Sequence, residues 1–361
     1  ATVMAPFRPS LSRQPSLLMA LALVSRLVTV PVGPTLARQP MALRSCGASW
    51  DHSPLWWVHI PKAGTSFVNV LVRAACPAYP LTTPLTRSSQ AASIARDEQY
   101  HCAGSLAHAH GRHWPLPLEF PPPEPYLITT GSHSAKPAIV GIFRHPRSRT
   151  VSGYFHNIHD CLWLHKELGL SHEENKDIGL RNAEHRHVRE RVFGTDGVNT
   201  SVLVAYAACT SSCQARMLNG VECGSKSLFM HAWERLRVDP SFRPAGADDQ
   251  TLARVERAVR RVTSEFAFVG VTELYAECVH AFAAWSGIPV LPKVHLMNTR
   301  PTWASPEMKA RADHMLSSTT FIDQPVYDAA SDRALTFIRC YRYSNSTLAG
   351  QDVPQRHHIG L

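Results

Sequence analysis

The chain has 361 residues, of which 44% are hydrophobic, and this length is enough for one large domain or two small ones. Its formal net charge is +9, but residues 1–50 contain five arginines and no acidic residue, so the rest of the chain carries a net charge of only +4. A charge this small does not indicate a nucleic-acid partner for the folded part.

The N-terminal segment has the composition of a targeting sequence. The apolar run 17–24 follows Arg8 and Arg13, with no acidic residue nearby, which is the pattern of a signal-peptide core. Read on to Val32, the run is a poor signal anchor, since a membrane span needs roughly 20 apolar residues. A basic, Ser-containing organellar transit peptide is the rival interpretation. We expect a targeting or anchor segment over 1–45, the folded domain over 46–345 and a tail over 346–361.

The first predicted element is a buried parallel strand over 55–60, which stops at Pro61 because proline cannot donate to a strand ladder. We expect a helix to follow up to about Ala75, with Thr65 or Ser66 as its cap. Residues 77–137 show little periodicity, and irregular connections of this length are often functional.

A second strand is predicted over 138–143, with Pro146 opening a helix that runs to about His159. The charged stretch 166–191 indicates a solvated helical face. Four further elements are expected: a helix over 250–262, a strand over 266–271, a helix over 273–285 capped by Thr272, and a helix over about 326–343. This alternation predicts a single α/β domain, with a parallel sheet flanked by helices on both faces.

The nine cysteines show no zinc-type double pair, and Cys209 and Cys213 form one pair at loose spacing. We expect no metal site. With a targeting segment, we expect a few disulfides in an oxidising lumen, and the odd count leaves at least one cysteine free or bonded to another molecule. Two glycosylation sequons, at Asn199 and Asn345, also favour a secretory location.

The turn after the first strand has anion-binding character. Gly64 lets the backbone approach an anion, and the amides from Gly64 to Phe67 face it from the helix start. Lys62 adds a positive charge at the same place. The turn lacks the Walker sequence, which argues against a nucleoside triphosphate. The alternative interpretation is an ordinary strand–turn–helix with an exposed lysine.

The turn after the second strand is basic. Arg144 stands at the carboxyl end of that strand, where open α/β sheets bind ligands, and its planar guanidinium suits a phosphate. Arg149 and Ser152 are three residues apart on the following helix and are predicted to share a face. Three arginines within residues 144–149 are unfavourable at a helix N-terminus unless an anion is present. Two such turns imply a ligand with two separated anionic groups.

These residues resemble a known family. Segment 59–66, HIPKAGTS, looks like the 5′-phosphosulfate loop of sulfotransferases that use 3′-phosphoadenosine 5′-phosphosulfate. Segment 143–154, with Arg144, Pro146, Arg149 and Ser152, looks like their 3′-phosphate motif, about 80 residues further on. The chain is most similar to the Golgi carbohydrate type, such as heparan sulfate 2-O- and 6-O-sulfotransferases. Weaker resemblances lie in segments 213–218, 268–273 and 323–330.

The resemblance implies a P-loop-like fold of the sulfotransferase type and a role for each matching residue. Lys62 would bind the oxygen that bridges sulfate and phosphate, and thereby stabilise the leaving phosphate. No metal is required. The residues expected to bind the cofactor are Lys62, Ala63, Gly64, Thr65, Ser66, Phe67, Arg144, Arg149 and Ser152.

The acceptor hydroxyl also needs a base, which related carbohydrate enzymes place between the two cofactor motifs. His113 best matches the family segment, and His110 is the next choice, because histidine titrates near neutral pH. The remaining choices in this interval are His108, His133 and the acids Glu98 and Glu119.

The resemblance therefore implies an enzyme that transfers a sulfuryl group to a carbohydrate hydroxyl and releases adenosine 3′,5′-bisphosphate. We expect it in the secretory pathway, in the Golgi lumen, as a type II membrane protein or a processed soluble form. Two alternatives stay open: a P-loop kinase of nucleotides or small molecules, and a catalytically silent glycan-binding relative.

Overall fold

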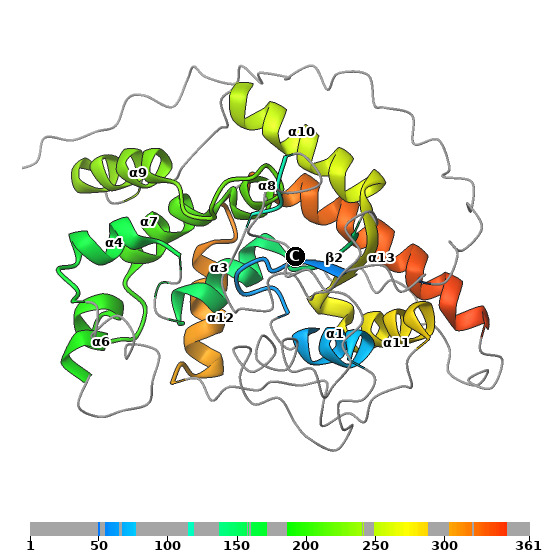
Figure 1. Ribbon diagram of the computed structural model, residues 1–361. Coiled ribbons are helices and arrows are strands. Elements are labelled where there is room, and N and C mark those ends of the chain that lie inside the picture. The colour runs from blue at the N-terminus through cyan, green and yellow to red at the C-terminus, as the bar shows by residue number, and fades with distance from the viewer. Residues whose placement is uncertain are drawn as a thin grey trace, which may run out of the picture. The chain divides into compact units, whose positions relative to one another are not determined.

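The structure, a computed structural model, describes residues 50, 55–64, 67–76, 115–118, 137–156, 158, 160–171, 186–239, 241, 249–287, 303–319 and 321–344. All of these belong to one compact unit, Cys46–Leu361. Its centre is a mixed α/β arrangement in which three parallel strands are flanked by helices (Figure 1). The strands are β1 (Leu55–Val58), β2 (Ala138–Phe143) and β3 (Phe266–Val271), in the spatial order β1-β2-β3.

The predicted strands are confirmed, and β2 and β3 have the predicted bounds. Almost every strand side chain is buried. Because successive side chains of a strand point to opposite faces, both faces of the sheet must be covered. β1 ends at Val58, two residues before the predicted end. There the chain turns away from the ladder, and the Ile60 N–H donates to the Val58 carbonyl (3.1 Å).

The helices that share a hydrophobic core with the sheet include α1 (Val68–Ala75), α10 (Asp249–Ser264), α11 (Tyr275–Ser286) and α13 (Gln324–Ser344). All four were predicted, but two predicted caps are wrong. The N-cap of α1 is Phe67, which makes no side-chain cap. Thr272 belongs to a 3₁₀ turn, η4 (Thr272–Leu274), so α11 begins two residues later than that cap requires.

A second hydrophobic core lies among helices that the sequence analysis mostly left out. They are α3 (Pro146–Tyr154), α4 (Leu162–Glu167), α6 (Arg186–Phe193), α7 (Thr200–Thr210), α9 (Lys226–Val238) and α12 (Pro306–Met315). Helix α3 stops at Tyr154 instead of His159, because Ile158 and Asp160 adopt positive φ angles of 48° and 67°. The solvated charged face predicted over 166–191 holds for α6, which buries only Val188, Val192 and Phe193.

Each of the two hydrophobic cores contains one of the described disulfides. Cys161 bonds to Cys209, and Cys213, at the start of α8 (Cys213–Met217), bonds to Cys223. The expectation of disulfides is confirmed, although Cys209 and Cys213 do not act as a pair. Cys278 is the free thiol of the described residues, and it is buried. Within the described ranges, no helix has the length and apolar character needed to cross a membrane.

Candidate functional site

The two motif turns lie next to each other at one edge of the sheet. Strands β1 and β2 are parallel neighbours, so their carboxyl ends meet at the same edge. The turn 61–64 follows β1, and Arg144 directly follows β2. The Arg144 Nη1 donates to the carbonyl oxygen of Lys62 at 3.2 Å. The structure therefore brings together the two turns that the sequence analysis singled out.

The backbone of the first turn takes an uncommon path. Lys62 and Gly64 both have left-handed φ angles, 61° and 69°. A side chain at Gly64 would place its Cβ 2.6 Å from Cγ2 of Ile142 on β2, so glycine is required there for two reasons. For a lysine, the left-handed region costs about 1 kcal/mol or more. Such strain is concentrated at functional sites, which makes Lys62 a functional candidate on geometry as well as on charge.

The amides of this turn are only partly available to a ligand. The Ala63 N–H donates to the Ile60 carbonyl (3.1 Å), and the Phe67 N–H donates to the Gly64 carbonyl (2.8 Å). No described residue accepts the N–H of Gly64. Of the four amides predicted to face an anion, from Gly64 to Phe67, the Phe67 N–H is therefore already used within the protein. Thr65 and Ser66 lie outside the described residues.

The side chains of Ala63 and Phe67 pack in the hydrophobic core. Both are buried, and the Phe67 ring packs against Phe268 and Phe282 with ring centroids 5.9 and 5.0 Å apart. These contacts join the start of α1 to β3 and α11. The turn is thus anchored on both sides, by Ile60 before it and by Phe67 after it, which fixes Gly64 between them.

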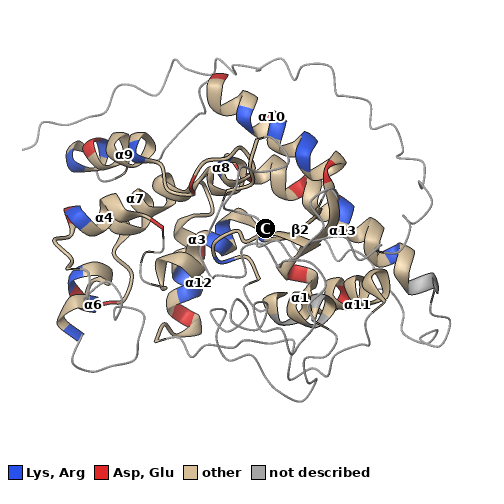
Figure 2. Ribbon diagram, viewed as in Figure 1, with Lys and Arg blue, Asp and Glu red and all other residues tan. Residues whose placement is uncertain are grey.

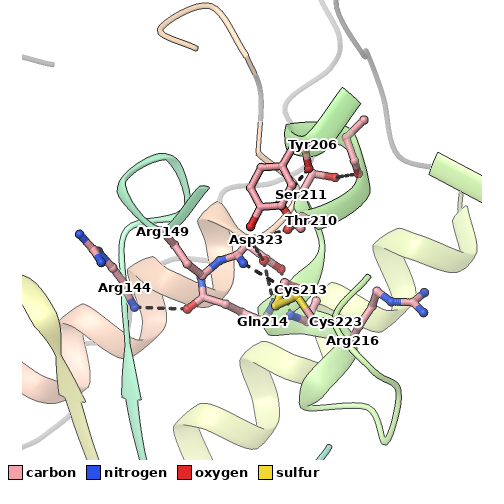
Figure 3. Close-up of polar contacts among 12 residues, drawn as sticks. Arg144, Arg149, Tyr206, Thr210, Ser211, Cys213, Gln214, Arg216, Cys223 and Asp323 are labelled. Atoms are coloured by element: carbon pink, nitrogen blue, oxygen red, sulfur yellow. Dashed lines mark hydrogen bonds and ion pairs between the residues drawn. A yellow bond between two sulfur atoms is a disulfide. The ribbon is translucent and has the colours of Figure 1, made fainter. Parts of the chain in front are cut away.

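The turn after β2 is held by two side chains from distant segments. The Arg144 N–H donates to Oε1 of Gln214 on α8 (3.4 Å), as Figure 3 shows, and the His145 N–H donates to Oε1 of Glu273 (3.0 Å). Glu273 lies just past β3, in η4, so the third strand also contributes to this edge. Burial lowers the pKa of His145, while the nearby Glu273 carboxylate opposes that shift.

The three arginines of this turn, Arg144, Arg147 and Arg149, differ in whether a carboxylate of the described residues pairs with them. Arg147 pairs with Asp313 on α12 (3.1 Å), and Arg149 lies 3.9 Å from the carboxylate of Asp323. The Arg144 guanidinium forms no ion pair with any described residue, and burial lowers its pKa. The expectation that all three require an external anion is therefore wrong for two of them. Arg144 is the cation of this turn that the described part of the protein leaves for a ligand.

Arg149 is turned into the protein. Its side chain is 1% exposed, and it contacts the Thr210 carbonyl and the Cys223 sulfur as well as Asp323 (Figure 3). Ser152, by contrast, is half-buried, and no described residue forms a hydrogen bond with its hydroxyl. Of the two residues, Ser152 is therefore the candidate to contact a ligand, whereas Arg149 supports the turn from within.

Three residues of this site were not singled out from the sequence: Gln214, Glu273 and Asp323. They lie in the segments 213–218, 268–273 and 323–330 that the sequence analysis noted, but nothing in the sequence gives them a role. The predicted base residues His113 and His110 lie outside the described residues, as do His108, His133, Glu98 and Glu119.

Acidic and basic residues are interspersed on several described helices away from this edge. Helices α9, α10 and α12 each carry acidic as well as basic residues (Figure 2). Within the described ranges, no group of three or more His, Cys, Asp or Glu side chains is arranged to hold a metal ion. Comparisons with models of protein families, with curated proteins and with solved structures found no match to this chain.

Proposed function

We propose that this protein is a sulfotransferase of the P-loop-like sulfotransferase fold. It transfers the sulfuryl group of 3′-phosphoadenosine 5′-phosphosulfate to a hydroxyl of a carbohydrate. The observation that carries the proposal is the contact between Arg144 and the Lys62 carbonyl, at 3.2 Å. It joins the Arg144 guanidinium to the main chain of Lys62, so residues of both motifs lie at the ends of neighbouring parallel strands.

Two adjacent turns of this kind suit a ligand that carries anionic groups on the 3′ and 5′ positions of one ribose. Arg144 and the Ser152 hydroxyl bind the 3′-phosphate, because a guanidinium and a hydroxyl are both good donors to phosphate oxygens. The Gly64 N–H, together with Thr65 and Ser66, receives the 5′ end. Arg149 and the buried side chains of Ala63 and Phe67 hold these groups in place.

Lys62 supplies the electrostatic part of the reaction. The acceptor oxygen forms a bond to sulfur while the bond from sulfur to the bridging oxygen breaks, and the leaving phosphate gains negative charge. The Lys62 ammonium stabilises that charge as it develops. His113 or His110 takes the proton of the acceptor hydroxyl. The product is adenosine 3′,5′-bisphosphate, and no metal ion takes part.

The location proposed for this reaction is the Golgi lumen. Disulfides persist in oxidising compartments and are rare in the cytosol. The described residues contain the pairs Cys161–Cys209 and Cys213–Cys223, and this supports a secretory protein. Carbohydrate acceptors with free hydroxyls fit the same compartment.

A magnesium-dependent kinase is less well supported. It would need a carboxylate available at this edge of the sheet to hold the metal. Glu273 is the carboxylate in that position among the described residues, and its two oxygens are engaged by the His145 N–H (3.0 Å) and the Thr272 hydroxyl (3.2 Å).

Thermal unfolding with added ligands tests the proposal. Adenosine 3′,5′-bisphosphate without magnesium should raise the melting temperature, and ATP with magnesium should do so much less. Transfer of radiolabelled sulfate from 3′-phosphoadenosine 5′-phosphosulfate to a panel of polysaccharides, small glycans and phenols then identifies the acceptor. Stabilisation by magnesium ATP alone would reject the proposal in favour of a kinase. Binding of the bisphosphate without transfer to any acceptor would indicate a silent relative.

A further inference from the structure

A chain of hydrogen bonds links Asp323 to Arg144 through Gln214 (Figure 3). The Gln214 N–H donates to Oδ2 of Asp323 at 2.7 Å, and the Gln214 side-chain oxygen accepts from the Arg144 N–H at 3.4 Å. The three residues come from the start of α13, from α8 and from the end of β2. Segments far apart in the sequence thus meet behind the motif turn.

The Asp323 end of this chain is rigid. Asp323 is fully buried, and its second oxygen accepts the Ala215 N–H at 2.9 Å. Hydrogen bonds to a carboxylate are stronger than neutral ones. The Arg149 guanidinium, 3.9 Å away, supplies the charge that a buried carboxylate needs. The first turn of α8 therefore has two main-chain groups tied to one side chain.

A covalent link holds the same turn. Cys213, the residue before Gln214, is bonded to Cys223, and Arg149 Nη1 lies 3.9 Å from the Cys223 sulfur. Gln214 is consequently fixed on both sides along the chain. Its side chain has little freedom to adopt another position.

The orientation of the Gln214 carboxamide follows from its partner. A main-chain N–H can only donate, so the amide must present its oxygen to Arg144. The amide nitrogen, Nε2, is buried and has no hydrogen-bond partner among the described residues. A buried donor without a partner is unfavourable. An aliphatic side chain would avoid that cost at this position but could not hold the Arg144 N–H.

We infer that Gln214 is a positioning residue for Arg144, and that Asp323 holds Gln214 in the position this requires. The inference rests on the proposed function, in which Arg144 binds the 3′-phosphate. With the Arg144 N–H held by Gln214 and its guanidinium held at the Lys62 carbonyl, the side chain has a defined direction. A preorganised donor binds its anion more tightly than one that must be ordered on binding.

The test uses the full chain and two substitutions of Gln214. Gln214→Met keeps the volume but removes the acceptor, and should weaken adenosine 3′,5′-bisphosphate binding about tenfold, the order expected for one neutral hydrogen bond. Adenosine 5′-monophosphate, which lacks the 3′-phosphate, should bind within about twofold of the wild type. Gln214→Glu keeps an oxygen acceptor, so the amide of Arg144 should exchange with solvent about as slowly as in the wild type. Calorimetry measures both ligands.

A matched control is Asn219→Leu. Asn219 is also a buried amide beside α8, but it donates to the carbonyls of Ala215 and Arg254 and does not contact Arg144. It should lower stability without changing the preference between the two nucleotides. A general loosening of α8 would instead affect Asn219→Leu and Gln214→Met alike, and that result would overturn the inference.

Hydrogen exchange gives a readout that needs no ligand. The amide of Arg144 should exchange at least tenfold faster in Gln214→Met and at the wild-type rate in Asn219→Leu. Unchanged exchange in Gln214→Met would overturn the positioning role. If the wild type fails to bind the bisphosphate while this exchange result holds, the proposed function is wrong and the positioning of Arg144 by Gln214 stands. A Gln214→Glu variant whose Arg144 amide exchanges as fast as that of Gln214→Met would also overturn the inference.

Discussion

The Arg144 guanidinium donates to the carbonyl oxygen of Lys62 at 3.2 Å, across 82 residues of sequence. The contact makes the two motif turns a single unit, because neither can move without disturbing the other. A side chain that reaches its neighbour's backbone also presents its remaining N–H groups at the edge between the strands. The predictions below start from this unit.

Arg144→Ala should weaken binding of adenosine 3′,5′-bisphosphate by about 2–3 kcal/mol, the size of a lost charge-assisted contact. Binding of adenosine 5′-monophosphate should change little, since it has no 3′-phosphate for Arg144 to hold. Calorimetric titration of both nucleotides measures the difference. Arg147→Ala is the control, because Arg147 lies in the same turn but pairs with Asp313 at 3.1 Å. Equal losses for the two nucleotides in Arg144→Ala would make Arg144 a structural residue.

Lys62→Gly should separate the backbone of the first turn from its charge. Lys62 has a φ of 61°, which glycine adopts without strain, so Lys62→Gly should be more stable than Lys62→Ala by about 1 kcal/mol. Both variants should lose turnover, because neither can stabilise the leaving phosphate. Urea unfolding gives the stabilities and sulfate transfer gives the activities. A Lys62→Gly protein less stable than Lys62→Ala would contradict the left-handed conformation.

His113→Ala should lower turnover by about 10²–10⁴-fold, the usual contribution of a general base, and leave the affinity for adenosine 3′,5′-bisphosphate nearly unchanged. The physical reason is that the base acts on the acceptor and not on the nucleotide. Steady-state rates and nucleotide titrations of the same preparations check this. If His113→Ala keeps its turnover, the same measurements on His110→Ala decide whether the role passes to His110. Activity in both variants directs the search to His108, His133, Glu98 and Glu119.

Asp323 should make the stability depend on pH. Burial raises its pKa to about 6, from 3.8 in an unperturbed side chain. Between these two pH values the folded protein binds a proton that the unfolded chain does not, so this group's contribution to stability falls as pH rises through that interval. We therefore subtract the free energy of unfolding of Asp323→Asn from that of the wild type. This difference should fall by on the order of 2–3 kcal/mol between pH 4 and pH 7. Urea unfolding across this range measures the difference. A difference that grows with pH would contradict a raised pKa for Asp323.

Asn199 combines a sequon with a helix cap, and two substitutions separate them. Its Oδ1 accepts the Val202 N–H at 3.3 Å as the N-cap of α7. Asn199→Asp removes the sequon but keeps a capping oxygen, so its stability should stay close to that of the wild type. Asn199→Ala removes both and should lose about 1 kcal/mol. Electrophoresis of protein secreted from eukaryotic cells reports the glycan.

The proposed secretory location predicts two further features of the protein secreted from eukaryotic cells. A glycan should be present at Asn199 or Asn345, and residues up to about 45 should be cleaved or should anchor the protein. A full-length product without glycan at either sequon would contradict the secretory location.

The strands and the motif turns were predictable because their causes are local. β2 and β3 are short apolar runs bounded by residues that end a strand, and Pro146 marks a helix start wherever the fold places it. The caps were less predictable, since Thr272 and Phe67 take their roles from how α11 and α1 pack against the sheet. Helices α7, α9 and α12 were not predicted; α7 is buried almost all round and so shows no amphipathic period.

The sequence by itself determined a parallel α/β arrangement and two turns with basic residues, each following a strand. Only the tertiary structure decided which arginine of the second turn is left for a ligand. Arg147 meets Asp313 and Arg149 meets Asp323, carboxylates that lie more than 160 residues away in the chain. Whether a charge is satisfied depends on what the fold brings within a few ångströms of it, and sequence spacing carries no such information. For the same reason the roles of Gln214 and Glu273 could not be predicted from the sequence. They contact the turn only because the fold places α8 and η4 beside it.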